Sequence, residues 1–98
     1  MLTEIAIVET NRLLALSGSY RMSQFEIDVL NKAGAYPQGP CDYYATAQSV
    51  LTERSKTDTS QNSSLKQLQI FANDDGCTIT LEPEIIPVVN IPVFGGSI

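Results

Sequence analysis

Residues 65–81 read LKQLQIFANDDGCTITL, and the way this stretch folds decides the fold class. Apolar and polar side chains alternate on both sides of Asp75-Gly76. Asp-Gly between two alternating runs is typical of the tight turn of a β-hairpin. We therefore predict a hairpin from about Leu65 to Glu82.

A fourth helix competes with the first strand of this hairpin. Leu65, Leu68 and Ala72 also satisfy the i, i+3, i+7 spacing of a helical face. The turn chemistry favours the hairpin.

An apolar segment, residues 85–94, follows the predicted hairpin and reads IIPVVNIPVF. Pro87 and Pro92 each remove a backbone donor, so the sequence predicts an edge strand or an extended arm. An uncharged apolar run of this kind promotes aggregation in water, so we expect the protein's own helices or another chain to cover it. The side chains expected to make this contact are Ile85, Ile86, Val88, Val89, Ile91, Val93 and Phe94.

The segments before the hairpin carry helix signals. Residues 2–16 have the spacing of an amphipathic helix with Thr3 as its N-cap, ended by Ser17-Gly18. A short strand over residues 4–9 is the alternative, because β-branched side chains gather there.

A capping box predicts a second helix. The Ser23 hydroxyl and the Glu26 carboxylate are spaced to bond each other's backbone N–H groups. The helix is expected to run to about Ala33, where Gly34 ends it.

A third helix is predicted from Pro40 to about Arg54. Residues 55–64 contain no apolar side chain, so we expect a flexible linker or an exposed loop there. Together these signals predict a single α+β domain over residues 1–98. It comprises a helical part at 1–54, a polar loop at 55–64 and a β part with an extended arm at 65–98.

The charge of the chain is unevenly distributed. The net charge is −5, and no Lys or Arg follows Lys66. This sign disfavours direct binding to nucleic acid or to a membrane surface. The acids of the C-terminal part are candidates for contact with a basic partner, and they are Asp74, Asp75, Glu82 and Glu84.

The composition also limits the chemistry that the chain can perform. It contains no histidine, which removes catalytic triads and imidazole bases, and its two cysteines lack CxxC spacing. We predict no enzyme activity, no cofactor and no metal site. Cys41 is either a reactive thiol at a helix start or, as we favour, a small half-buried side chain. A Cys41–Cys77 disulfide would require an oxidising compartment.

The sequence gives few indications of location. No run approaches the roughly 20 apolar residues of a bilayer helix, and the N-terminus carries an acid where a secretory signal has lysines. We expect a cytoplasmic protein.

The expected function is non-enzymatic protein binding. We favour an assembly subunit whose residues 85–94 dock by strand addition on a copy of itself, forming a homo-oligomer, or on a larger complex. An acidic inhibitor of the phage- or plasmid-borne type, blocking a basic groove, is the first alternative. A ribosomally made precursor peptide with a helical leader and a C-terminal core is the second.

Overall fold

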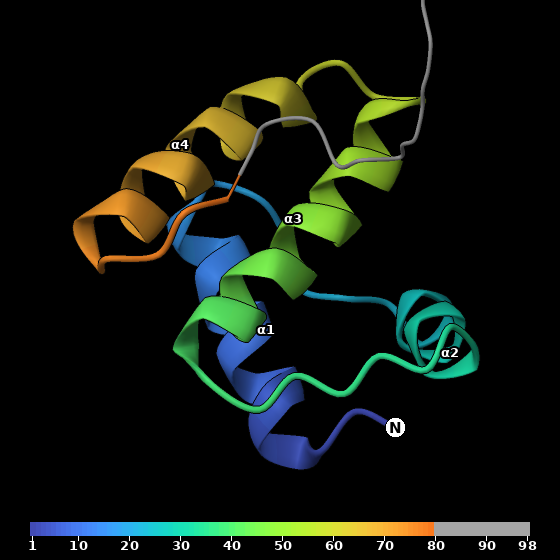
Figure 1. Cartoon of the computed structure of the whole chain (residues 1–98). Coiled ribbons are helices and arrows are strands. Elements are labelled where there is room, and N and C mark those ends of the chain that lie inside the picture. The colour runs from blue at the N-terminus through green and yellow to red at the C-terminus, as the bar shows by residue number, and fades with distance from the viewer. Residues whose placement is uncertain (80–98) are drawn as a thin grey trace, which may run out of the picture.

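The computed structural model describes residues 1–79, which form four helices and no strand. In Figure 1, α1, α3 and α4 pack against one another, whereas α2 lies to one side of them. The predicted α+β fold is therefore wrong for the part of the chain that is described. The helices are α1 (Glu4–Leu16), α2 (Gln24–Lys32), α3 (Pro40–Ser55) and α4 (Gln61–Asp74).

The predicted β-hairpin is replaced by α4 and its C-terminal cap. Asp75 is the C-cap residue, and Gly76 follows it with φ +80°. The Gly76 N–H donates to the Asn73 carbonyl (3.0 Å), and the Cys77 N–H donates to the Ala72 carbonyl (2.8 Å). These two bonds define a Schellman motif, which ends a helix. Asp-Gly thus ends a helix here and does not connect two strands.

Two other helices end in the same way. Gly18 follows α1 with φ +87°, and Gly34 follows α2 with φ +82°. In each case the next residue, Ser19 or Ala35, donates its N–H to the carbonyl five residues back. The glycine terminators predicted for these two helices are confirmed.

The predicted N-terminal caps are confirmed as well. The Thr3 hydroxyl accepts from the Ala6 N–H (3.1 Å), so residues 4–9 are helical and the alternative strand is absent. At α2 the Ser23 hydroxyl accepts from the Glu26 N–H (3.1 Å), and the Glu26 carboxylate accepts from the Ser23 N–H (2.8 Å). Pro40 occupies the first turn of α3, where its missing N–H costs nothing.

Half of the polar stretch 55–64 is helical, contrary to the predicted loop. Because α3 ends at Ser55 and α4 begins at Gln61, only residues 56–60 connect them. The Asp58 carboxylate accepts from the backbone N–H (3.1 Å) and the hydroxyl (2.6 Å) of Ser60. These bonds hold the pKa of Asp58 below its usual value.

The hydrophobic core lies between α1, α3 and α4. Its largest fully buried side chains are Leu14, Leu51, Leu68 and Thr10. A disulfide between Cys41 and Cys77 ties the first turn of α3 to the residues just after α4. Within residues 1–79, none of the helices has the length and the apolar character that crossing a bilayer requires.

Several predicted site residues lie outside the described residues. They are Glu82, Glu84 and the whole apolar segment 85–94.

Candidate functional site

Helix α2 is the least buried element of the described chain. None of its nine residues is buried, and Phe25 and Val29 are 74% and 46% exposed. Its inner face is half-buried, because Ile27 and Leu30 pack against the core. Helix α2 therefore presents a second apolar face that no described residue covers.

A groove of about 660 Å³ runs between α2 and the second half of α3. Its apolar lining comes from Tyr20, Phe25, Val29, Leu30 and Val50. Its polar lining comes from Ser23, Glu26, Ser49, Glu53, Arg54 and Thr57. The groove is a concave, mainly apolar surface of the kind that ligands and peptides occupy.

At one end of this groove, Arg54 connects α3 to α2 and to the α1–α2 connection by hydrogen bonds. Its side chain is almost completely buried, at 5% exposed, and its Nε and Nη2 bond the two Glu26 carboxylate oxygens at 2.7 and 2.8 Å. Nη1 donates to the Ser19 hydroxyl (2.9 Å) and the Tyr20 carbonyl (2.7 Å), and Nη2 donates to the Arg21 carbonyl (3.1 Å). These bonds use all five N–H donors of the guanidinium.

The face of the Tyr20 ring packs against the Arg54 guanidinium. The Arg54 Cζ atom lies 3.8 Å from the ring centroid, which is the geometry of a cation–π contact. Tyr20 is 58% exposed, so much of its surface is open to solvent beside the groove. Tyr20 thus links the buried ion pair to the open groove.

The ion pair also changes the acidity of its carboxylate. The hydrogen bond from Arg54, together with the Ser23 backbone bond, holds the pKa of Glu26 below its usual value, against the opposing effect of burial. Glu26 therefore stays ionised at neutral pH. The charges of Arg54 and Glu26 neutralise each other, and neither is free to bind an ionic ligand.

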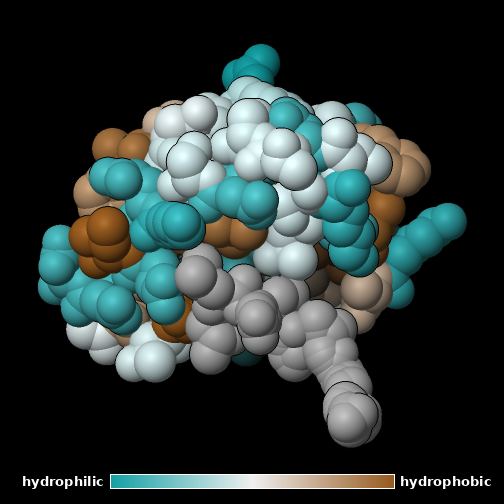
Figure 2. Space-filling view, turned by 90° about the horizontal axis from the view of Figure 1, so that it is seen from above, coloured by the Kyte–Doolittle hydropathy of each residue, from teal (hydrophilic) through white to brown (hydrophobic). Residues whose placement is uncertain are grey.

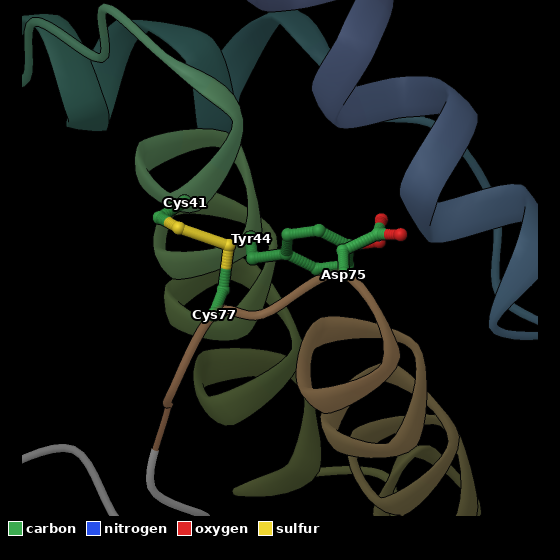
Figure 3. The surroundings of a disulfide bond; sticks show 4 residues. All are labelled: Cys41, Tyr44, Asp75 and Cys77. Carbon is green, nitrogen blue, oxygen red and sulfur yellow. A yellow bond between two sulfur atoms is a disulfide. The ribbon is translucent and has the colours of Figure 1, made fainter.

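A second cluster surrounds the disulfide. Figure 3 shows the Tyr44 side chain reaching from α3 toward Asp75, beside the Cys41–Cys77 bond. The Tyr44 hydroxyl donates to the Asp75 carboxylate. Burial first, and then this hydrogen bond, raise the pKa of Tyr44 to about 12. Because Cys41 is disulfide-bonded, the reactive-thiol hypothesis does not apply to this structure.

The described part of the predicted site lies away from the groove. Asp74 is the last residue of α4, and Asp75 is its C-cap. The Asp75 carboxylate accepts the hydrogen bond of the Tyr44 hydroxyl. Neither lines the groove. Sequence reasoning missed the groove and its ion pair. One signal was available, since Arg54 continues the buried row of Ala47 and Leu51 at helical spacing.

Other apolar side chains reach the surface outside the groove. Ile5, Val8 and Leu16 of α1 and Ile70 of α4 are each more than half exposed. Figure 2 shows hydrophobic residues as separate patches among hydrophilic ones on the face in view. These positions provide controls for the groove, because they have similar exposure and do not line it.

No family model, curated protein or solved structure was found to match the chain.

Proposed function

We propose that this chain is a non-enzymatic subunit that binds another protein chain. The observation that carries the proposal is the groove between α2 and α3, where Phe25, Val29 and the Tyr20 ring are exposed around a concave surface. Aromatic side chains in a concave apolar site are common anchors of protein interfaces. Binding there would remove this apolar surface from water.

The polar groups of the groove support binding over catalysis. Arg54 donates to Glu26, to a hydroxyl and to two backbone carbonyls, so its hydrogen-bonding capacity is used within the fold. Glu26 accepts from Arg54 and from the Ser23 N–H. Glu53, which also lines the groove, pairs with Lys56 in solvent. Recognition would therefore rest mainly on shape and apolar contact, with the Arg54–Glu26 pair keeping the groove in place.

The apolar segment 85–94 is the part of the chain that we propose docks on another chain. The mode differs from the predicted strand addition, because residues 1–79 contain no sheet edge to which a strand could be added. An apolar groove between helices is the alternative acceptor that the described fold offers.

Deleting residues 83–98 tests this function. The deletion leaves all four helices and the disulfide partners in place, so we expect unchanged helical content by circular dichroism. We expect assembly, measured as solution mass by light scattering, to be lost. A deleted chain that assembles like the full chain would contradict the proposal.

The disulfide bears on the predicted cytoplasmic location. Stable disulfides form in oxidising compartments and are rare in the cytosol. We propose that the protein works where Cys41 and Cys77 are oxidised, which makes a reducing cytoplasm the less favoured location. Thiol labelling with maleimide immediately after lysis of the native host tests this, and labelling of both cysteines would refute it.

The acidic-inhibitor alternative has less support from the structure. Asp75 is engaged by Tyr44, which leaves Asp74 as the unengaged member of the described acidic pair. Binding through the acidic residues would weaken steeply with added salt, whereas apolar docking would not. Salt dependence therefore separates the two functions.

A further inference from the structure

The two halves of the Cys41–Cys77 disulfide differ in their access to solvent. Cys41 is exposed in the first turn of α3, whereas Cys77, which follows the cap of α4, is 3% exposed. A thiolate opens a disulfide by attacking one sulfur in line with the S–S bond, and the other sulfur leaves. In the folded protein, Cys41 is therefore the half that an external thiolate can approach.

The stability of the leaving thiolate alone would favour the opposite direction of attack. Unpaired backbone N–H groups in the first turn of α3 would stabilise a Cys41 thiolate, whereas burial disfavours a Cys77 thiolate. The better-stabilised thiolate leaves faster, so attack at Cys77 would be the quicker reaction if access were equal. Access decides the direction here, because the fold closes the path to Cys77.

Three carboxylates lie close to the disulfide along the chain. Asp42 follows Cys41, and Asp74 and Asp75 come three and two residues before Cys77. All three aspartates are exposed, and Figure 3 shows Asp75 beside the disulfide. Exposed carboxylates attract a cationic reagent to the bond and repel an anionic one.

Arg12 is a cation whose charge reaches this region. Burial first, and then Asp75, raise the pKa of Tyr44, and the charge of Arg12 acts on it in the opposite direction. The Arg12 guanidinium is paired with Glu9 at 2.9 Å, so it brings a further carboxylate with it. Negative charge therefore prevails over this cation beside the disulfide.

Opening the disulfide leaves the noncovalent contacts between α3 and α4 in place. Leu51 of α3 and Leu68 of α4 are fully buried in the core. The Tyr44 hydroxyl donates to the Asp75 carboxylate, which also joins α3 to the cap of α4. We therefore expect the folded protein to carry an adduct at Cys41, where the chain is open to solvent.

We propose that Cys41 is a thiolation site, at which a positively charged low-molecular-weight thiol opens the disulfide of the folded protein. This inference goes beyond the proposed function and does not depend on the groove. It assigns the site of attack to one cysteine and the charge of the reagent to the surrounding aspartates.

The reaction has two steps. In the first, the thiolate of the reagent bonds the Cys41 sulfur, the S–S bond breaks, and the Cys77 sulfur leaves with the electron pair and takes a proton from water. In the second, another thiolate attacks the reagent's sulfur in this mixed disulfide, and Cys41 leaves as a thiolate. Two thiols are thereby oxidised to their disulfide, and the protein disulfide is reduced.

Peptide mapping after a brief reaction tests the site of attack. The oxidised full chain is mixed with cysteamine, a thiol that carries an ammonium group, and an acid quench stops further exchange. Digestion with pepsin at low pH and mass spectrometry locate the adduct. We expect cysteamine on Cys41 and a free thiol at Cys77, with the helical content by circular dichroism unchanged.

Four results would overturn the assignment of the site. They are an adduct on Cys77, equal adducts on both cysteines, reduced protein without an adduct on Cys41, and an opening rate that does not rise with cysteamine concentration. The last result would mean that unfolding limits the reaction, so that the exposure of Cys41 in the folded protein would have no role.

A comparison of two thiols tests the charge preference. The opening rates with cysteamine and with anionic mercaptopropionate are each divided by the rate of the same thiol with hydroxyethyl disulfide, which is small and uncharged. At about 0.1 M salt we expect this ratio to favour cysteamine about 3-fold or more, and to approach unity at about 1 M salt, where charges are screened. A ratio that does not favour cysteamine, or that salt does not change, would refute the preference.

A matched pair of variants tests the source of the preference. Asp42→Asn removes a charge beside Cys41 and keeps an oxygen that can accept from the Gln38 N–H. Glu53→Gln also removes one carboxylate from α3, but twelve residues from Cys41, which is about 18 Å and beyond the Debye length of about 10 Å. We expect Asp42→Asn to lower the preference for cysteamine about 2-fold and Glu53→Gln to leave it unchanged. Equal effects of the two variants would refute the role of the local carboxylates.

Discussion

At the scale of single residues, Arg54 joins three parts of the described chain. Its guanidinium bonds the start of α2 through Glu26 and the preceding loop through Ser19 and the carbonyls of Tyr20 and Arg21. A charged side chain this deeply buried is tolerated only when its partners are complete. Arg54 therefore helps to fix the position of α2, and with it the shape of the groove, together with the packing of Ile27 and Leu30 against the core.

Arg54→Lys is expected to lower the free energy of unfolding by about 2–4 kcal/mol, because an ammonium cannot replace five fixed N–H donors. Urea denaturation of the oxidised protein measures the change. Lys56→Ala is the control, since the Lys56–Glu53 pair is more than 60% exposed on both sides and should contribute less than about 1 kcal/mol. Equal losses in the two variants would contradict the role given to Arg54.

Tyr44 predicts a change in stability at high pH. Its pKa is raised to about 12, so its protonated form is favoured by folding. The stabilisation is complete below the unfolded pKa of about 10 and is lost as pH rises toward 12, by roughly 2–3 kcal/mol. Ultraviolet titration should show a tyrosine that ionises late, and Tyr44→Phe should remove that step. A titration curve whose high-pH end is unchanged by Tyr44→Phe would contradict this.

These residue contacts were the least predictable feature from the sequence. The sequence places Arg54 at the fading end of a helix and Glu26 in a capping box, and neither pattern indicates the other. The pair forms only because the α1–α2 connection brings α2 against the end of α3. Long-range contacts of this kind depend on tertiary packing, which local spacing does not specify.

At the scale of elements, α1, α2 and α3 were predictable because their signals are local. Thr3, Ser23 and Pro40 begin helices, and Gly18 and Gly34 end them, each through contacts within a few residues. The error lies in α4, where Gly76 is a third terminator of the same kind. Asp-Gly suits a hairpin turn and a helix C-cap equally, because both place glycine at positive φ.

The polar character of residues 55–64 reinforced that error. Gln61 and Ser64 lack apolar side chains, yet both are buried. The Ser19 hydroxyl donates to the Gln61 side-chain oxygen (2.6 Å), which links the α1–α2 connection to the start of α4. A part-buried hydrogen bond between residues 42 positions apart cannot be read from local composition.

Gly76→Ala tests the cap that ends α4. Because nothing lies within 4 Å of the added Cβ, the expected loss of about 1–2 kcal/mol comes from the backbone alone. Gly39→Ala is the control, since Gly39 also has open space but an extended backbone with φ −148°. Because Gly39 is the N-cap of α3, where alanine is less favoured than glycine, thermal or urea unfolding should show a smaller loss of about 0.5 kcal/mol there. A hairpin at residues 65–82 would instead give strand signals by NMR secondary shifts.

At the scale of the whole molecule, charge and apolar surface act in opposite directions on assembly. Each copy carries a net charge of −5, so two copies repel each other at low ionic strength. The exposed groove and the apolar segment 85–94 favour association. Salt screens the repulsion without weakening apolar contact. We therefore expect assembly that is maintained or strengthened by salt.

The most direct measurement is the solution mass of the oxidised full chain and of the chain lacking residues 83–98, by light scattering at low and high salt. We expect a discrete oligomer of the full chain that persists at high salt, and a monomer after the deletion. A full chain that is monomeric throughout, an oligomer that dissociates on adding salt, or a deleted chain that still assembles would contradict the account.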